Sequence, residues 1–102
     1  MSQVFEITNA DQHDAFIINN DKCIIFFGSA RCPHCQTMVP IIDKMASSYP
    51  KIKFSHVETT KVKTEGINGV PAFVGYKSRQ AVDVVLGADP DAITAMIKNY
   101  LS

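Results

Sequence analysis

Residues 23–35 read CIIFFGSARCPHC and join a continuous apolar run to two cysteines separated by a proline and a histidine. The apolar run, residues 23–28, predicts a central strand covered on both faces, as in a parallel sheet. After the cysteines, apolar residues recur at helical spacing from about Pro33 to Ser48, which predicts a helix. Cys32 therefore stands between a buried strand and the first turn of the helix that follows it.

The remaining chain predicts an α/β domain with a mixed sheet. Further strands are expected at residues 3–7, 51–58, 71–77 and 81–87, helices at 9–19 and from Asp89 onward, and short helical turns at 60–66. The last two strands are joined by Ser78-Arg79-Gln80, a connection short enough for a hairpin. Early alternation of strands and helices, followed by a late hairpin, implies a mixed five-stranded sheet with helices on both faces. The chain of 102 residues fits one domain, 1–102, without a linker.

Composition and charge exclude several classes of function. The chain has ten basic and ten acidic residues, a formal net charge of zero and no long block of one sign. This balance argues against nucleic acid and polybasic membrane binding. No apolar stretch reaches the roughly 18 residues of a membrane span, and the N-terminus lacks a basic leader with an apolar run. We therefore expect a soluble, cytoplasmic monomer with no nucleic-acid or membrane partner.

The cysteine pair has three interpretations: a redox dithiol, half of a metal site, or two inert core thiols. A zinc site usually takes four ligands from two such pairs, or from one pair and two histidines. The remaining candidate ligands are Cys23, His13, His34 and His56, and they form no second pair. An odd, small number of cysteines is also unlike a disulfide framework. The spacing therefore favours a redox pair that needs no metal or cofactor beyond its own disulfide, while Cys23 is interpreted as a small buried hydrophobe.

The predicted position of Cys32 favours its thiolate. Unpaired backbone N–H groups and the helix dipole stabilise negative charge at a helix N-terminus. His34, Arg31 and Pro33 are predicted to tune this thiol, two by their positive charge and Pro33 by its place in the first turn. An arginine that is simply solvated in the loop is the competing interpretation of Arg31. Cys35, about one helical turn further on, is close enough to resolve a mixed disulfide formed at Cys32.

Together these motifs resemble the thioredoxin family over nearly the whole chain. The resemblance rests on Cys32-Pro33-His34-Cys35, Pro40 in the same helix, the loop Gly69-Val70-Pro71, and Gly87 before the last helix. It implies a thioredoxin fold and a thiol–disulfide oxidoreductase in which Cys32 attacks and Cys35 resolves. It also implies a cis Val70–Pro71 peptide packed against the cysteines. Val70, Pro71 and Gly87 would then line the surface that receives an extended segment of a disulfide-containing protein substrate.

Several residues depart from the family pattern. Arg31 stands where the family has a tryptophan, and Phe26 where it has a buried aspartate that relays a proton. His56, which replaces a lysine on the neighbouring strand, is a candidate proton relay in place of that acid, against the alternative of a packed histidine. The Pro-His dipeptide resembles that of DsbA, an oxidising family member. We therefore expect a reduction potential between about −270 mV and about −120 mV.

Two other functions stay open on the sequence alone. The first is a glutaredoxin-like enzyme that works with glutathione, because such proteins often carry Cys-Pro-x-Cys. Charges that would bind glutathione are not evident near Pro71 or Gly87, where Asp89 and Asp91 are the only candidates. The second is a non-catalytic binding module with a thioredoxin fold. The reductant that recycles the dithiol, thioredoxin reductase or glutathione, is likewise left open.

Overall fold

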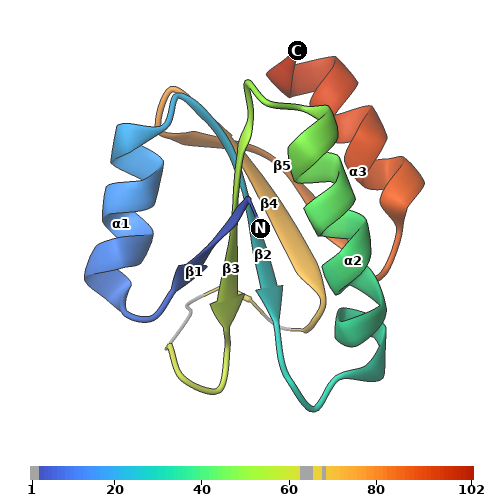
Figure 1. The fold of residues 1–102 in the computed structure, drawn as a ribbon. Helices are drawn as coiled ribbons and strands as arrows, with labels where there is room; N and C mark the ends of the chain where they lie inside the picture. The colour runs from blue at the N-terminus through green and yellow to red at the C-terminus, as the bar shows by residue number, and fades with distance from the viewer. Residues whose placement is uncertain (1–2, 63–65, 68) are drawn as a thin grey trace.

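The computed structural model, which describes residues 3–62, 66–67 and 69–102, has a five-stranded sheet between helices (Figure 1). The elements are β1 (Val4–Ile7), α1 (Ala10–Asn19), β2 (Lys22–Gly28), α2 (Pro33–Ser48), β3 (Lys53–Glu58), β4 (Ala72–Lys77), β5 (Gln80–Leu86), α3 (Pro90–Met96) and a π-helical turn, η1 (Ile97–Leu101). The strand order is β1-β3-β2-β4-β5, with β1, β3 and β2 parallel and β4 antiparallel to both neighbours. The predicted fold class is confirmed.

The central strand β2 divides the core into two layers. Ile24 and Phe26 point to the face covered by α2, α3 and η1, whereas Ile25 and Phe27 point to the face covered by α1. All of residues 23–28 are buried, which explains why this segment is apolar without alternation. Burial of each large apolar side chain contributes about 1.5–3 kcal/mol, so this strand anchors both layers.

The helix α2 begins directly after Cys32 and buries a narrow stripe against the sheet. Its buried residues are Cys35, Met38, Ile42 and Ala46. Pro33 occupies the first turn, where a missing N–H costs nothing, and Pro40 lies inside the helix. Because Cys35 is the first residue of this stripe, the packing that holds the helix against the sheet also holds the second cysteine in place.

Three local features differ from the sequence prediction. The hairpin connection contains only Ser78 and Arg79, with φ of 53° and 71°, as in the tight turns whose twist matches antiparallel strands. Residues 60–62 form a turn rather than helix, in which the Val62 N–H donates to the Glu58 carbonyl; residues 63–65 of the expected segment lie outside the described residues. The last helix ends at Met96 and continues as the π-helical turn, whose Leu101 is buried.

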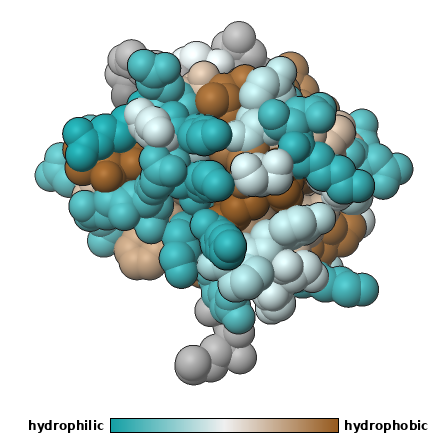
Figure 2. Space-filling view, turned by 90° about the horizontal axis from the view of Figure 1, so that it is seen from above, coloured by the Kyte–Doolittle hydropathy of each residue, from teal (hydrophilic) through white to brown (hydrophobic). Residues whose placement is uncertain are grey.

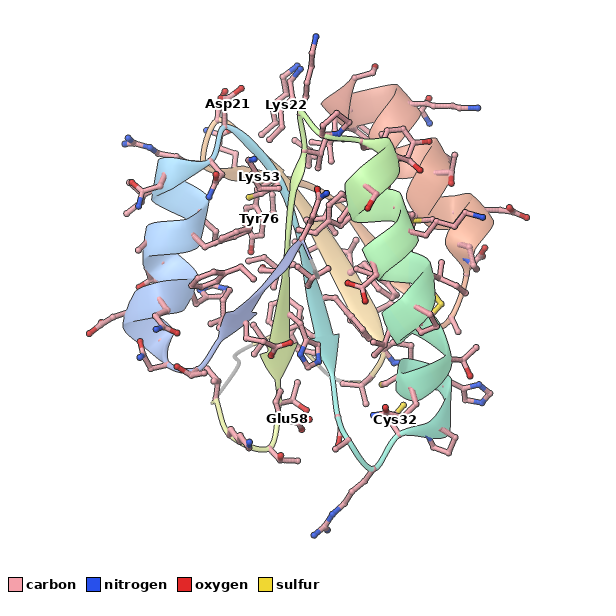
Figure 3. The ribbon with its side chains drawn as sticks, viewed as in Figure 1. Asp21, Lys22, Cys32, Lys53, Glu58 and Tyr76 are labelled. Carbon is pink, nitrogen blue, oxygen red and sulfur yellow. The ribbon has the colours of Figure 1, made fainter. Side chains whose placement is uncertain are left out.

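The end of the sheet opposite to Cys32 has a mainly polar surface. Figure 2 views the molecule from this end and shows hydrophilic side chains around a patch of hydrophobic ones. A hollow of about 270 Å³, between the end of α2 and η1, is lined by Tyr49, Ile52, Ile97 and Leu101 together with Lys22, Lys51 and Lys98. Cys32 and Cys35 lie at the opposite end of the sheet from this hollow, just after the chain leaves β2 (Figure 3).

Candidate active site

Cys32 is the N-cap residue of α2 and lies at the lower end of the sheet in Figure 3. Its sulfur accepts a hydrogen bond from the Cys35 N–H at 3.2 Å. The side chain is half-buried, so the sulfur is within reach of a partner. A backbone donor and the helix end both stabilise negative charge at this sulfur, which makes Cys32 suited to act as a nucleophile.

Cys35 has the opposite environment, with 2% of its surface exposed. Burial, followed by hydrogen bonding to Cys32, raises the pKa of the Cys35 thiol to about 11. Gly28 allows this close packing, because a Cβ there would lie 2.9 Å from Cε1 of Phe26 and 3.4 Å from Cβ of Cys35. Since only the thiolate attacks a disulfide, Cys35 needs a proton acceptor before it can react.

The loop before β4 brings Val70 next to Cys32, and Gly87, which follows β5, is hydrogen-bonded to Pro71 of that loop. The Val70–Pro71 peptide is cis, as the family resemblance implies. The Cys32 thiol lies 3.9 Å from the Val70 carbonyl oxygen, to which it donates, and the Gly87 N–H donates to the Pro71 carbonyl at 2.8 Å. Gly87 has φ of 90°, a backbone conformation that favours glycine.

This loop borders an apolar groove. Its volume is about 390 Å³, and its lining includes Ile67, Val70, Pro71, Val84 and Leu86. Leu86 is 72% exposed on β5, an edge strand of the sheet. The groove thus offers both apolar side chains and the Val70 backbone to a neighbouring chain.

His56 lies behind Cys35 in a row that crosses three strands. The register pairs Glu6 of β1 with His56 of β3, and His56 with Phe26 of β2. The Nδ1 atom of His56 is 3.0 Å from Oε2 of Glu6, and its ring centroid is 5.0 Å from that of Phe26. His56, Glu6, Phe26 and Cys35 all line one cavity of about 240 Å³. The structure therefore brings His56 and Cys35 to the same space.

Comparison with known proteins identifies the family. The thioredoxin family model matches residues 4–99. The chain belongs to the thioredoxin family. Thioredoxin 1 of Plasmodium falciparum is 29% identical over 98 residues, which cover 92% of this chain and 94% of that one. Mitochondrial thioredoxin-3 of Saccharomyces cerevisiae is 28% identical, with 96% and 80% covered. A solved structure of Plasmodium falciparum thioredoxin superposes with a TM-score of 0.89 at 29% identity, over 95% of this chain and 99% of that one.

These relatives support a thiol–disulfide oxidoreductase that acts on disulfide-containing substrates and draws on a reductant. Thioredoxins use no cofactor beyond their active-site dithiol. One relative is named as mitochondrial, so a cytoplasmic location for this chain stays a prediction. Within the part of the chain that the structure describes, no helix combines the length and apolar character needed to cross a bilayer.

The residues predicted to tune Cys32 lie on the surface of this thioredoxin site. Arg31, Pro33 and His34 are exposed. In residues 3–62, 66–67 and 69–102, no hydrogen bond or ion pair engages the side chains of Arg31 or His34. Any effect of these two residues on Cys32 therefore acts through their charge rather than through a direct bond.

Glu58 organises the loop before Cys32, a role that the sequence did not indicate. Its Oε1 accepts from the Ala30 N–H at 2.8 Å, and its Oε2 accepts from the Thr60 hydroxyl at 2.8 Å. Burial opposes ionisation of Glu58, but the hydrogen bonds from Thr60 and Ala30 outweigh it and lower the pKa of the carboxyl. Figure 3 shows Glu58 and Cys32 at the same end of the sheet. This contact joins β3 to the loop, and no local pattern could have revealed it.

Cys23 lies apart from the other two cysteines. It is fully buried at the start of β2 and pairs in register with Tyr76 of β4, which Figure 3 shows towards the end of the sheet away from Cys32. Burial, and then the nearby Asp21 charge, raise the pKa of the Cys23 thiol to about 11. Among the described residues, no three His, Cys, Asp or Glu side chains gather as metal ligands. The structure therefore places Cys23 in the core, as the sequence interpretation expects.

Proposed function

We propose that this chain is a protein-disulfide reductase or isomerase that uses Cys32 as the attacking thiol and Cys35 as the resolving thiol. The observation that carries the proposal is the contrast between the two sulfurs. Cys32 is partly exposed and accepts the Cys35 N–H, whereas Cys35 is buried in its protonated form. Cys32 is thus suited to attack a substrate disulfide, and Cys35 to attack the mixed disulfide that results.

The reaction proceeds by two exchanges. The Cys32 thiolate attacks one sulfur of a substrate disulfide, forms a mixed disulfide and releases the other substrate sulfur as a thiolate. Cys35 then loses its proton, which His56 accepts, and attacks the Cys32 sulfur. The Cys32–Cys35 disulfide forms, the second substrate thiolate leaves, and the substrate has gained two electrons. Thioredoxin reductase or glutathione returns the protein to its dithiol form.

The substrate is an extended segment of a disulfide-containing protein. Val70, whose carbonyl oxygen lies 3.9 Å from the Cys32 sulfur, also lines the apolar groove. This arrangement suits recognition by strand addition, in which main-chain hydrogen bonds supply affinity. Such recognition is tolerant of sequence, which fits a protein that acts on several substrates. The protein works as a monomer, in the cytoplasm.

A reduction assay with insulin and dithiothreitol tests this function. The wild type should accelerate precipitation of the insulin chains, and Cys32→Ser should lower the rate at least about a hundredfold, because no nucleophile remains. Incubated with insulin in the absence of dithiothreitol, Cys35→Ser should instead accumulate a mixed disulfide at Cys32, seen by mass spectrometry. Cys23→Ser is the matched control, since it removes a thiol remote from the substrate groove.

The same assay separates the competing functions. A non-catalytic binding module would leave the insulin rate unchanged, and activity with Cys32→Ser would contradict the proposed nucleophile. A glutaredoxin-like enzyme would respond to glutathione and not to dithiothreitol, whereas the proposed reductase or isomerase turns over with dithiothreitol. Near Pro71 and Gly87 the candidate glutathione contacts, Asp89 and Asp91, are acidic, and Asp89 already accepts from the Ala92 N–H.

A further inference from the structure

A carboxylate stands behind the histidine that shares a cavity with Cys35. Glu6 approaches Nδ1 of His56 with both oxygens, at 3.1 Å and 3.0 Å. The side chain of His56 is 19% exposed and that of Glu6 is 65% exposed. The pair therefore connects the cavity behind a buried thiol with solvent at the edge of the sheet.

We propose that Glu6 is a positioning residue that holds His56 in the tautomer able to take the Cys35 proton and stabilises the resulting imidazolium. This inference rests on the proposed function, because it concerns the resolving step of that reaction. A carboxylate that accepts from Nδ1–H leaves Nε2 as the basic nitrogen of a neutral imidazole. The same carboxylate then faces a cation once Nε2 is protonated, and a charge-assisted hydrogen bond is stronger than a neutral one.

The proton has a route through the cavity. The cavity volume of about 240 Å³ has room for several water molecules. The proton leaves the Cys35 sulfur, crosses by water to Nε2 of His56, and passes to solvent after turnover. The electron pair left on Cys35 forms the bond to the Cys32 sulfur, and the Cys32–substrate bond breaks towards the departing sulfur. The substrate disulfide is the oxidant, so no further reagent is needed.

Several groups surround His56, and hydrogen bonding to Nδ1 makes Glu6 its proposed carboxylate partner. Glu6 faces it from β1, Phe26 from β2, Glu58 from β3 itself, and Cys35 and Asp43 line the shared cavity from α2. Glu58 accepts hydrogen bonds from Ala30 and Thr60, and its charge interacts with His56 through space. Both oxygens of Glu6 lie within hydrogen-bonding distance of Nδ1, at 3.1 Å and 3.0 Å.

Reaction of the reduced protein with one equivalent of dithiobis-nitrobenzoate tests the proposal. Attack by Cys32 releases a first thionitrobenzoate, and resolution by Cys35 releases a second, so the two steps appear as separate absorbance phases. We expect Glu6→Gln to slow the second phase roughly three- to tenfold and to leave the first unchanged. His56→Asn keeps an amide N–H near the position of Nδ1 but offers no base, so it should slow the second phase at least about tenfold.

The pH profile separates proton transfer from a merely structural effect. With His56 in place, the second phase should rise much less than tenfold per pH unit, because the imidazole rather than hydroxide accepts the proton. In His56→Asn it should keep rising about tenfold per pH unit, because hydroxide must then remove the proton of a thiol whose pKa is about 11. The double variant should be no slower than His56→Asn, since Glu6 acts only through His56.

A second histidine–carboxylate pair provides the control. His13 and Asp14 of α1 lie 3.1 Å apart, away from the cavity, so Asp14→Asn removes a similar charge without touching the relay. An equal slowing by Asp14→Asn, or a normal second phase in Glu6→Gln, would overturn the inference and leave the proposed function intact. A normal second phase in His56→Asn would overturn the inference and also remove His56 from the proposed reaction, while Cys32 and Cys35 kept their roles. A wild type that releases no second thionitrobenzoate would overturn both.

Discussion

At the scale of single residues, burial and backbone contacts give two identical thiols different chemistry. Cys32 receives a backbone N–H at a helix end, whereas Cys35 loses solvent and has its pKa raised to about 11. The sequence predicts the position of Cys32, because a strand followed by Cys-Pro-x-Cys places the first cysteine at the helix N-terminus, but it does not predict the burial of Cys35. Glu6 and Glu58 could not be predicted, because their contacts depend on the register and loop geometry of strands distant in sequence.

His34 tests the influence of an unbonded charge on Cys32. Replacing it by serine removes a potential cation from the first turn of α2 and with it part of the stabilisation of the reduced thiolate form. We expect His34→Ser to lower the reduction potential by roughly 30 mV, making the protein more reducing. The potential is measured in glutathione buffers by alkylation and mass analysis. His13→Ser, on α1, is the matched control, and an unchanged potential in His34→Ser would refute the tuning role.

At the scale of elements, the apolar patterns predict where strands and helices lie, and short polar segments are where the prediction is weakest. The run at residues 23–28 and the stripe of α2 are long and regular, so their type follows from spacing. The hairpin turn is shorter than expected because Ser78 and Arg79 both adopt positive φ, a backbone conformation that neither residue type favours. The strand order β1-β3-β2-β4-β5 was not predicted, since periodicity carries no information on which strands pair.

The hairpin offers a direct test of that backbone conformation. A left-handed backbone costs a residue with a Cβ about 1–2 kcal/mol, and glycine avoids this cost. Glycine also destabilises the folded state by about 0.5–1 kcal/mol, because its unfolded backbone has more conformational freedom to lose. We expect Arg79→Gly to stabilise the protein by about 0.5 kcal/mol and to raise Tm by about 2–4 °C in thermal unfolding followed by circular dichroism. Arg79→Ala removes the same side chain but keeps the Cβ. An equal gain with alanine would show that the backbone conformation is not the cause.

At the scale of the whole molecule, the fold separates one reachable sulfur from two enclosed ones. Cys23 is 0% and Cys35 is 2% exposed, and the pKa of each is about 11. We therefore expect iodoacetamide at neutral pH to modify the reduced native protein once, at Cys32, and the guanidinium-unfolded chain three times. Intact mass and peptide mapping give the count and the position. Rapid modification of Cys23 in the native protein would contradict this arrangement, and Cys32→Ser should show no rapid adduct.

The β2–β4 pairing has a consequence for how activity responds to damage. The cysteines belong to the part of the chain up to β3, and the residues that line the apolar groove belong to the part after β3. The β2–β4 pairing, from Cys23–Tyr76 to Phe27–Ala72, holds these two parts together. A chain clipped between β3 and β4 would retain its thiols, yet it would act on proteins only while its two fragments stayed associated. Small disulfide reagents, which need no groove, would still be consumed by the first fragment. The ratio of the two activities therefore reports whether the two parts of the molecule are joined.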